Sequence, residues 1–210
     1  MLEGLKTIVQ IFAALAIAAA PLYGAGEKPD IDAILKLFEK KDYDGVVAKV
    51  DEAGSAGDEA AFLLNLKGAA LTKKKDYPAA RQAFQQALQL SPGLFAAAFN
   101  IGETDFLQRN YANALDWFRS MLVSDPRNEL LQFKIFLCQL QLGDKEAAGK
   151  TLSKMRYPGD SPAWYYAQAA WEISAGDKGK AKKYITAARS IFPGKTELFD
   201  ETFIDLGFPK

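Results

Sequence analysis

Apolar residues recur at helical spacing at five places along the chain. In each place three apolar side chains follow one another at i, i+4 and i+7, which puts them on one stripe of an α-helix. The five sets are Val46, Val50, Ala53; Ala80, Phe84, Ala87; Ala114, Phe118, Met121; Ala148, Leu152, Met155; and Ala181, Ile185, Ala188. Alternation with the period of a β-strand is absent. The pattern predicts an all-α fold.

A polar residue precedes each of these helices at a nearly constant interval. The pairs are Asp42-Tyr43, Asp76-Tyr77, Asn110-Tyr111, Asp144-Lys145 and Asp177-Lys178, with steps of 34, 34, 34 and 33 residues. A period of this length is typical of repeat proteins built from one helix pair per repeat. We therefore expect a second helix before each of these turns.

Small residues and prolines support the same division. Gly68 and Gly102 recur 34 residues apart on the first helices, opposite Ala80 and Ala114 on the second helices. Small residues on both sides allow two helix backbones to approach closely. Proline lacks an amide donor and restricts the residue before it, so the sequence predicts helix ends at Ser91-Pro92, Asp125-Pro126 and Phe192-Pro193.

The array formed by these residues resembles the tetratricopeptide repeat consensus, and the next 34 residues resemble it again. The first array is Gly68, Leu71, Tyr77, Ala80, Phe84, Ala87 and Pro92. The resemblance implies a right-handed superhelical solenoid of about five helix pairs, at about 27–60, 61–94, 95–128, 129–161 and 162–194. Residues 195–210, with Leu198, Phe199, Phe203 and Leu206, predict a short C-terminal capping helix.

The first segment has the pattern of an export signal. Lys6 is followed by an apolar run from Ile8 to Leu22 that is interrupted by Gln10 alone, and small residues follow from Gly24 to Gly26. A charged start, a short apolar stretch and small residues at its end are typical of a signal peptide, which we place at 1–26. An uncleaved membrane anchor and a buried amphipathic helix are the alternatives. The expectation is an exported tetratricopeptide repeat protein of bacterial type, periplasmic or secreted, possibly tethered to the membrane.

Composition excludes several classes of function. Lys plus Arg and Asp plus Glu both number 26, so the basic excess that nucleic-acid binding needs is absent. There is no histidine, which removes the usual general base and the commonest ligand of transition metals. Cys138 is the single cysteine, so no intrachain disulfide can form. We expect no enzyme, catalytic residue, metal or cofactor; a glycosidase built on Asp and Glu alone is disfavoured because no carboxylate pair is singled out by pattern.

The resemblance to tetratricopeptide repeats also implies a binding surface. In that family the first helices line a concave groove that binds a partner protein or peptide. Carried over to this sequence, the groove residues are Asn65, Phe99, Asn100, Glu103, Phe106, Phe133, Lys134 and Tyr166. The predicted function is an adaptor or scaffold with a largely apolar groove. The alternative for aromatic residues such as Phe99 and Phe133 is packing against the next repeat.

A second function from a different class stays open at this point. Trp164, Tyr165, Tyr166 and Trp171 lie close together in the sequence near the C-terminal end. Such a cluster would suit a periplasmic module that binds a small ligand, either a peptide or a glycan. The sequence alone does not determine the oligomeric state.

Overall fold

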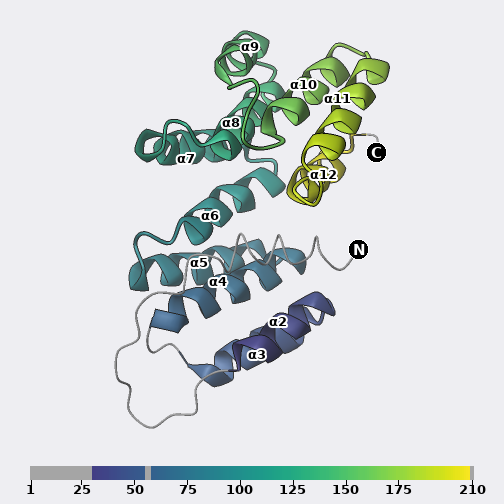
Figure 1. The fold of residues 1–210 in the computed structure, drawn as a ribbon. Helices are drawn as coiled ribbons and strands as arrows, with labels where there is room; N and C mark the ends of the chain where they lie inside the picture. Colours follow the sequence, from purple (N-terminus) through teal and green to yellow (C-terminus); the bar gives the residue numbers. More distant parts are fainter. Residues whose placement is uncertain (1–29, 55–57, 209–210) are drawn as a thin grey trace. The chain divides into compact units, whose positions relative to one another are not determined.

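The computed structural model describes residues 30–54 and 58–208 of the chain, and the segments with regular structure within these ranges are α-helices (Figure 1). The predicted signal peptide, residues 1–26, lies outside the described residues. The helices are α2 (Ile31–Glu39), α3 (Tyr43–Ala53), α4 (Asp58–Lys73), α5 (Tyr77–Leu90), α6 (Phe95–Leu107), α7 (Tyr111–Ser124), α8 (Glu129–Gln141), α9 (Lys145–Lys154), α10 (Ala163–Ser174), α11 (Lys178–Ile191) and α12 (Glu197–Asp205).

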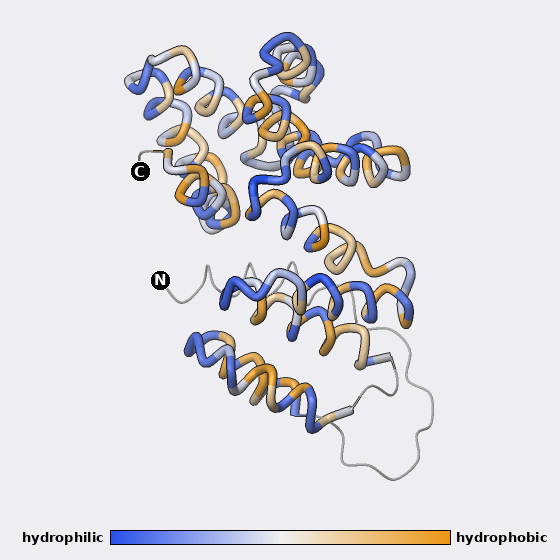
Figure 2. Tube along the Cα trace, turned by 180° about the vertical axis from the view of Figure 1, so that it is seen from behind, coloured by the Kyte–Doolittle hydropathy of each residue, from blue (hydrophilic) through white to orange (hydrophobic). Residues whose placement is uncertain are grey.

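The predicted all-α fold of helix pairs with a short final helix is confirmed. The described residues fall into two compact units, an N-terminal unit that ends at Thr104 and a C-terminal unit that begins at Asp105. Helix α6 begins in the first unit and ends in the second. Every helix carries both hydrophilic and hydrophobic residues (Figure 2), as amphipathic helices that share a core must.

The recurring polar residue before each second helix is its N-cap. The side chains of Asp42, Asp76, Asp144 and Asp177 each accept a hydrogen bond from a backbone N–H three residues on, in the first turn of α3, α5, α9 and α11. Such a cap satisfies one of the amide donors that the start of a helix leaves unpaired. Asn110 occupies the same place before α7 without a side-chain bond.

A left-handed residue stands directly before each of these caps. The residues are Lys41, Lys75, Arg109, Gly143 and Gly176, with φ between 61° and 87°. A residue in this conformation ends the first helix and reverses the chain. Lysine or arginine fills three of the five places, where glycine would adopt the conformation at lower cost. The basic run from Lys73 to Lys75 is therefore part of an exposed turn between two helices.

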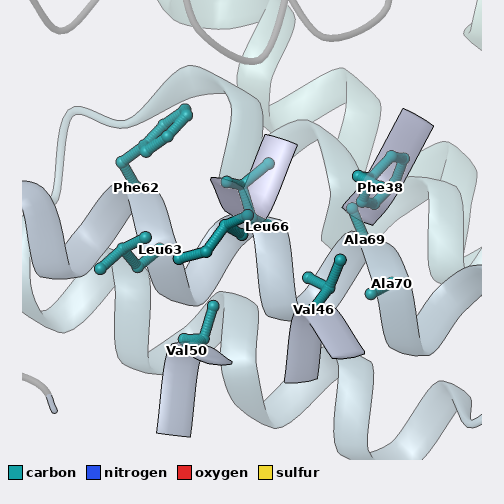
Figure 3. Packing of buried hydrophobic residues seen from close by; sticks show 9 residues of the cluster. Phe38, Val46, Val50, Phe62, Leu63, Leu66, Ala69 and Ala70 are labelled. Atoms are coloured by element: carbon teal, nitrogen blue, oxygen red, sulfur yellow. The ribbon is translucent and has the colours of Figure 1, made fainter. Parts of the chain in front are cut away.

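The core of the N-terminal unit lies between its first three helices (Figure 3). Phe38 of α2, Val46 and Val50 of α3, and Leu63 and Leu66 of α4 are buried together. The last position of the predicted stripe, Ala53, is exposed because α3 ends at that residue. Of the corresponding residues, Ala87, Met155 and Ala188 are buried, as the pattern predicts, and Met121 is half-buried.

Helix α8 is the centre of the C-terminal unit. It packs against α7, α9 and α10, and its residues from Phe133 to Gln139 are all buried. A helix that is buried around its whole circumference needs neighbours on every side. Three of these neighbours are helices of the repeats, and the fourth is α12, as described below.

The close approach of first and second helices is clearest at Gly68. A methyl group at this position would lie 2.4 Å from Cε1 of Phe84, a ring that is itself buried. The ring of Phe84 on α5 thus packs directly against the backbone of α4 at Gly68. Because the ring is 1% exposed, moving it aside would disturb the side chains packed around it.

We expect Gly68→Ala to lower the free energy of unfolding by about 1–3 kcal/mol, the usual cost of overpacking a core. Urea unfolding followed by circular dichroism measures it. Gly93→Ala is the matched control, since no atom lies within 4 Å of the added carbon and its backbone has no left-handed φ. Equal stability of the two variants would show that Phe84 does not pack on Gly68.

Candidate functional site

In the N-terminal unit the structure joins two of the predicted groove residues. The Nδ2 of Asn100 on α6 donates a hydrogen bond to Oδ1 of Asn65 on α4, at 3.0 Å, and both side chains are buried. Nδ2 of Asn65 is buried and has no hydrogen-bond partner among the described residues. Phe99 is also buried and stacks on Phe95, with ring centroids 6.1 Å apart. Glu103 is half-buried.

In the C-terminal unit the predicted residues lie around a buried lysine. Lys134 on α8 is 1% exposed, and its Nζ lies 4.7 Å from the centroid of the Phe106 ring. A cation over an aromatic face is attracted by the charge distribution of the ring, more strongly where water is excluded. The same Nζ donates a hydrogen bond to Oγ1 of Thr202, at 3.0 Å. Thr202 belongs to α12, so the C-terminal helix reaches α8.

Helix α12 lies across the predicted groove residues of α8 and α10. The ring of Phe199 is 5.1 Å from that of Phe133 and 5.2 Å from that of Tyr166, measured between centroids. Phe203 meets Tyr166 edge-on at 5.1 Å. Burial of each phenylalanine stabilises the docked helix by about 1.5–3 kcal/mol. We call Phe133, Lys134, Tyr166 and Arg189 the α12 site.

The polar contacts of the α12 site converge on Asp200. The hydroxyl of Tyr166 donates to Oδ1 of Asp200 at 2.6 Å, and Nη2 of Arg189 on α11 donates to the same oxygen at 2.7 Å. Thr196 donates to the other carboxylate oxygen at 3.2 Å. Burial, followed by the bond to the Asp200 carboxylate, raises the pKa of the Tyr166 hydroxyl well above its ordinary value. Tyr166 therefore stays a neutral donor.

Seven of the eight predicted groove residues are thus buried inside the chain, and only Glu103 is partly accessible. This arrangement agrees with the alternative of core packing for Phe99 and Phe133. Phe133 packs against the C-terminal helix rather than against a following repeat. For the α12 site, a partner would have to take the place of α12. The role of the eight residues in binding a partner stays a prediction.

Sequence reasoning identified Phe199 and Phe203 as apolar residues of a final helix but missed Asp200, Thr202 and Arg189. The i, i+4 spacing of the two phenylalanines was the available signal for the contact face of α12. Nothing in the local sequence connects Thr202 to a lysine 68 residues away. We also expected the final helix to cover the last repeat, and the structure shows that it extends to α8 of the repeat before.

The C-terminal aromatic residues do not form one surface. Tyr166 faces α12, whereas Trp171 lies near Gly149 of α9. Trp164 and Tyr165 both contact Tyr157, which is 61% exposed. In the described part of the chain no three His, Cys, Asp or Glu residues are grouped to hold a metal ion. Nor is any helix of residues 30–54 and 58–208 long and apolar enough to cross a membrane.

Tyr166→Phe removes a hydrogen bond to a charged group and should lower the free energy of unfolding by about 1.5–3 kcal/mol near neutral pH. The folded-state pKa of Tyr166 is raised, so its contribution is complete below the ordinary tyrosine pKa of about 10 and is lost as pH rises further. The difference in stability between wild type and variant should therefore shrink above about pH 10.

Urea unfolding between pH 7 and pH 11 checks this, with Tyr77→Phe in the N-terminal unit as control for the loss of one phenol. A difference between wild type and Tyr166→Phe that stays constant or grows above pH 10 would contradict the predicted bond to Asp200.

The model of the family described as tetratricopeptide repeat matches this chain over residues 47–95 and 65–129. Cellulose synthase operon protein C of Escherichia coli (strain K12) is 31% identical over 83 residues, which are 40% of this chain. The chain spans about 7% of the length of that relative.

Solved structures share the fold. A tetratricopeptide repeat protein from Parabacteroides merdae ATCC 43184 superposes with a TM-score of 0.61 over 87% of this chain and 75% of its own, at 16% identity. MamA 41-end from Desulfovibrio magneticus RS-1 gives 0.59 over 80% of this chain and 96% of its own, also at 16% identity. The family match over residues 47–129, the repeated helix pairs and this likeness to solved structures show that the described residues have the fold of tetratricopeptide repeats.

Proposed function

We propose that this chain is an exported scaffold that binds a partner protein or peptide through the groove side of its first helices and carries out no catalysis. Tetratricopeptide repeats form extended surfaces for binding other chains. One observation carries the proposal furthest: the predicted groove residues of α8 and α10 already hold an amphipathic helix, α12. Helix-in-groove contact is an established mode of peptide recognition.

The N-terminal unit offers accessible positions on the same side of its first helices. Thr72 on α4 and Glu103 on α6 are half-buried, and Thr72 lies seven residues after Asn65 on the same helix. A buried asparagine pair beneath such positions gives a rigid base. We assign the contact with a partner in this unit to the surface around Thr72 and Glu103.

The test compares two double variants that each raise the net charge by two. Thr72→Arg with Glu103→Gln changes the proposed surface, and Gln82→Arg with Gln86→Arg changes the exposed side of α5. Crosslinking in living cells is followed by affinity capture and quantitative mass spectrometry. We expect a partner recovered with wild type and with the α5 variant, and reduced at least about tenfold with the first variant, a loss of roughly 1.4 kcal/mol or more.

Circular dichroism and thermal unfolding establish beforehand that both variants are folded. A partner that is lost only with the α5 variant would assign binding to the second helices and contradict the proposal. Failure to recover any partner with the wild-type chain would remove its support.

The export part of the proposal rests on the apolar segment before residue 27. The mature protein should begin at residue 25 or 27, after cleavage behind Gly24 or Gly26. Cell fractionation and the intact mass of the recovered protein measure this. A chain that keeps residue 1 and sediments with membranes would replace the cleaved signal peptide with an uncleaved anchor.

A further inference from the structure

The contacts that hold α12 come from a five-residue segment of that helix. Phe199 and Phe203 supply the two rings, Asp200 the carboxylate and Thr202 the hydroxyl. The spacing is an aromatic residue, an acid, any residue, a hydroxyl and a second aromatic residue. All four side chains lie within about one turn of helix, so another helix with the same spacing presents the same groups.

The surroundings of the α12 site are matched to this segment in charge. Helix α12 contains Glu197, Asp200, Glu201 and Asp205 and no basic residue. Two cations face it: Arg189 of α11 donates to the Asp200 carboxylate, and Lys134 of α8 donates to Thr202. An acidic helix is attracted to such a surface, and a basic helix is repelled.

The length of α12 and its connection to α11 allow this helix to detach from the α12 site. It has nine residues, fewer than the roughly 12–15 that an isolated helix needs in water, so its helical form depends on docking. The segment from Phe192 to Thr196 joins it to α11 and contains Gly194 at φ 74°. Helices α8 to α11 also contact one another directly, without the participation of α12. Local opening of α12 alone is therefore possible without unfolding the repeats.

We propose that the α12 site is the docking surface for an acidic amphipathic helix of a partner protein, and that α12 is an internal ligand which this helix displaces. The inference rests on the proposed scaffold function and names the chemistry of the partner for the C-terminal unit. The partner helix carries two aromatic residues four apart, an acid directly after the first, and a hydroxyl before the second. A helix that lacks the acid leaves Arg189 and the Tyr166 hydroxyl without the acceptor that α12 provides.

Helix α12 competes with an external helix for the α12 site and therefore lowers the apparent affinity for that helix. A segment tied by a short linker competes at an effective concentration in the millimolar range. The apparent affinity for an external helix is reduced by the fraction of molecules in which the site is open. Weakening the docking of α12 should therefore strengthen the binding of an external helix.

The experiment uses the full chain and a fluorescein-labelled peptide of residues 195–208 as probe. Fluorescence anisotropy compares wild type with Phe203→Ala, which weakens α12 but leaves every residue of the α12 site unchanged. We expect the variant to bind the probe at least tenfold more tightly than wild type does. A peptide with Phe199 and Phe203 replaced by alanine, and one with Asp200→Lys, should show no binding. Equal binding of the probe to wild type and variant, or of the probe and the Asp200→Lys peptide, overturns the proposal.

If Phe203→Ala does not fold, hydrogen exchange of the wild-type chain tests whether α12 detaches by local opening. The amides of α12 should exchange through local opening while those of α8 stay protected. Exchange of both helices only through global unfolding would make α12 a fixed part of the core and overturn the proposal. Light scattering that shows dimers held by exchanged α12 helices would do the same, because the occupant would then be a second copy.

The outcomes separate this inference from the proposed function. A partner captured through Thr72 and Glu103, together with no binding of the probe, refutes the α12 site alone. Probe binding with no partner captured by the wild-type chain leaves a working site and refutes the scaffold.

Discussion

The two antiparallel helices of one repeat bury one face against each other. Each pair still has a second apolar face that the pair alone leaves open to water. The neighbouring repeat packs against this apolar face and buries it. The last repeat of an array has no such neighbour, so another element must bury its apolar face. In the C-terminal unit α12 is this element, with Phe199 and Phe203 on rings of α8 and α10. The same contact covers residues that the sequence predicts to line a partner-binding groove. Under the proposed function, stability and partner binding depend on the same residues.

The contacts of α12 include polar groups as well as aromatic rings. If α12 served only to exclude water, apolar side chains alone would be sufficient. Burying charged groups costs the free energy of removing them from water. The chain instead places Lys134, Arg189 and Tyr166 under α12 and matches each to an oxygen of that helix. The buried contacts of Lys134 and Tyr166 fix the position and orientation of the helix more narrowly than apolar packing does, and the exposed pair of Arg189 with Asp200 adds to them. Under the proposed docking of a partner helix, these contacts also select which helix binds.

The sequence was sufficient for the helix pairs because their signals are local. An aspartate caps the helix that directly follows it, and Gly68 meets Phe84 within the same repeat. The burial of Phe133, Lys134 and Tyr166 could not be predicted in the same way. It depends on a helix that returns over a repeat 68 residues earlier in the chain. The family pattern gives the side of α8 and α10 on which these residues lie, but not whether the chain itself occupies that side.

The central claim is that α12 lies on α8 and α10 of its own chain. Replacement of Phe199 by the photoreactive residue p-benzoylphenylalanine, followed by irradiation and peptide mapping, tests it most directly. The account predicts crosslinks to peptides from residues 129–141 and 163–174 of the same chain. Crosslinks confined to other elements of the chain, or their absence, would contradict the docking of α12.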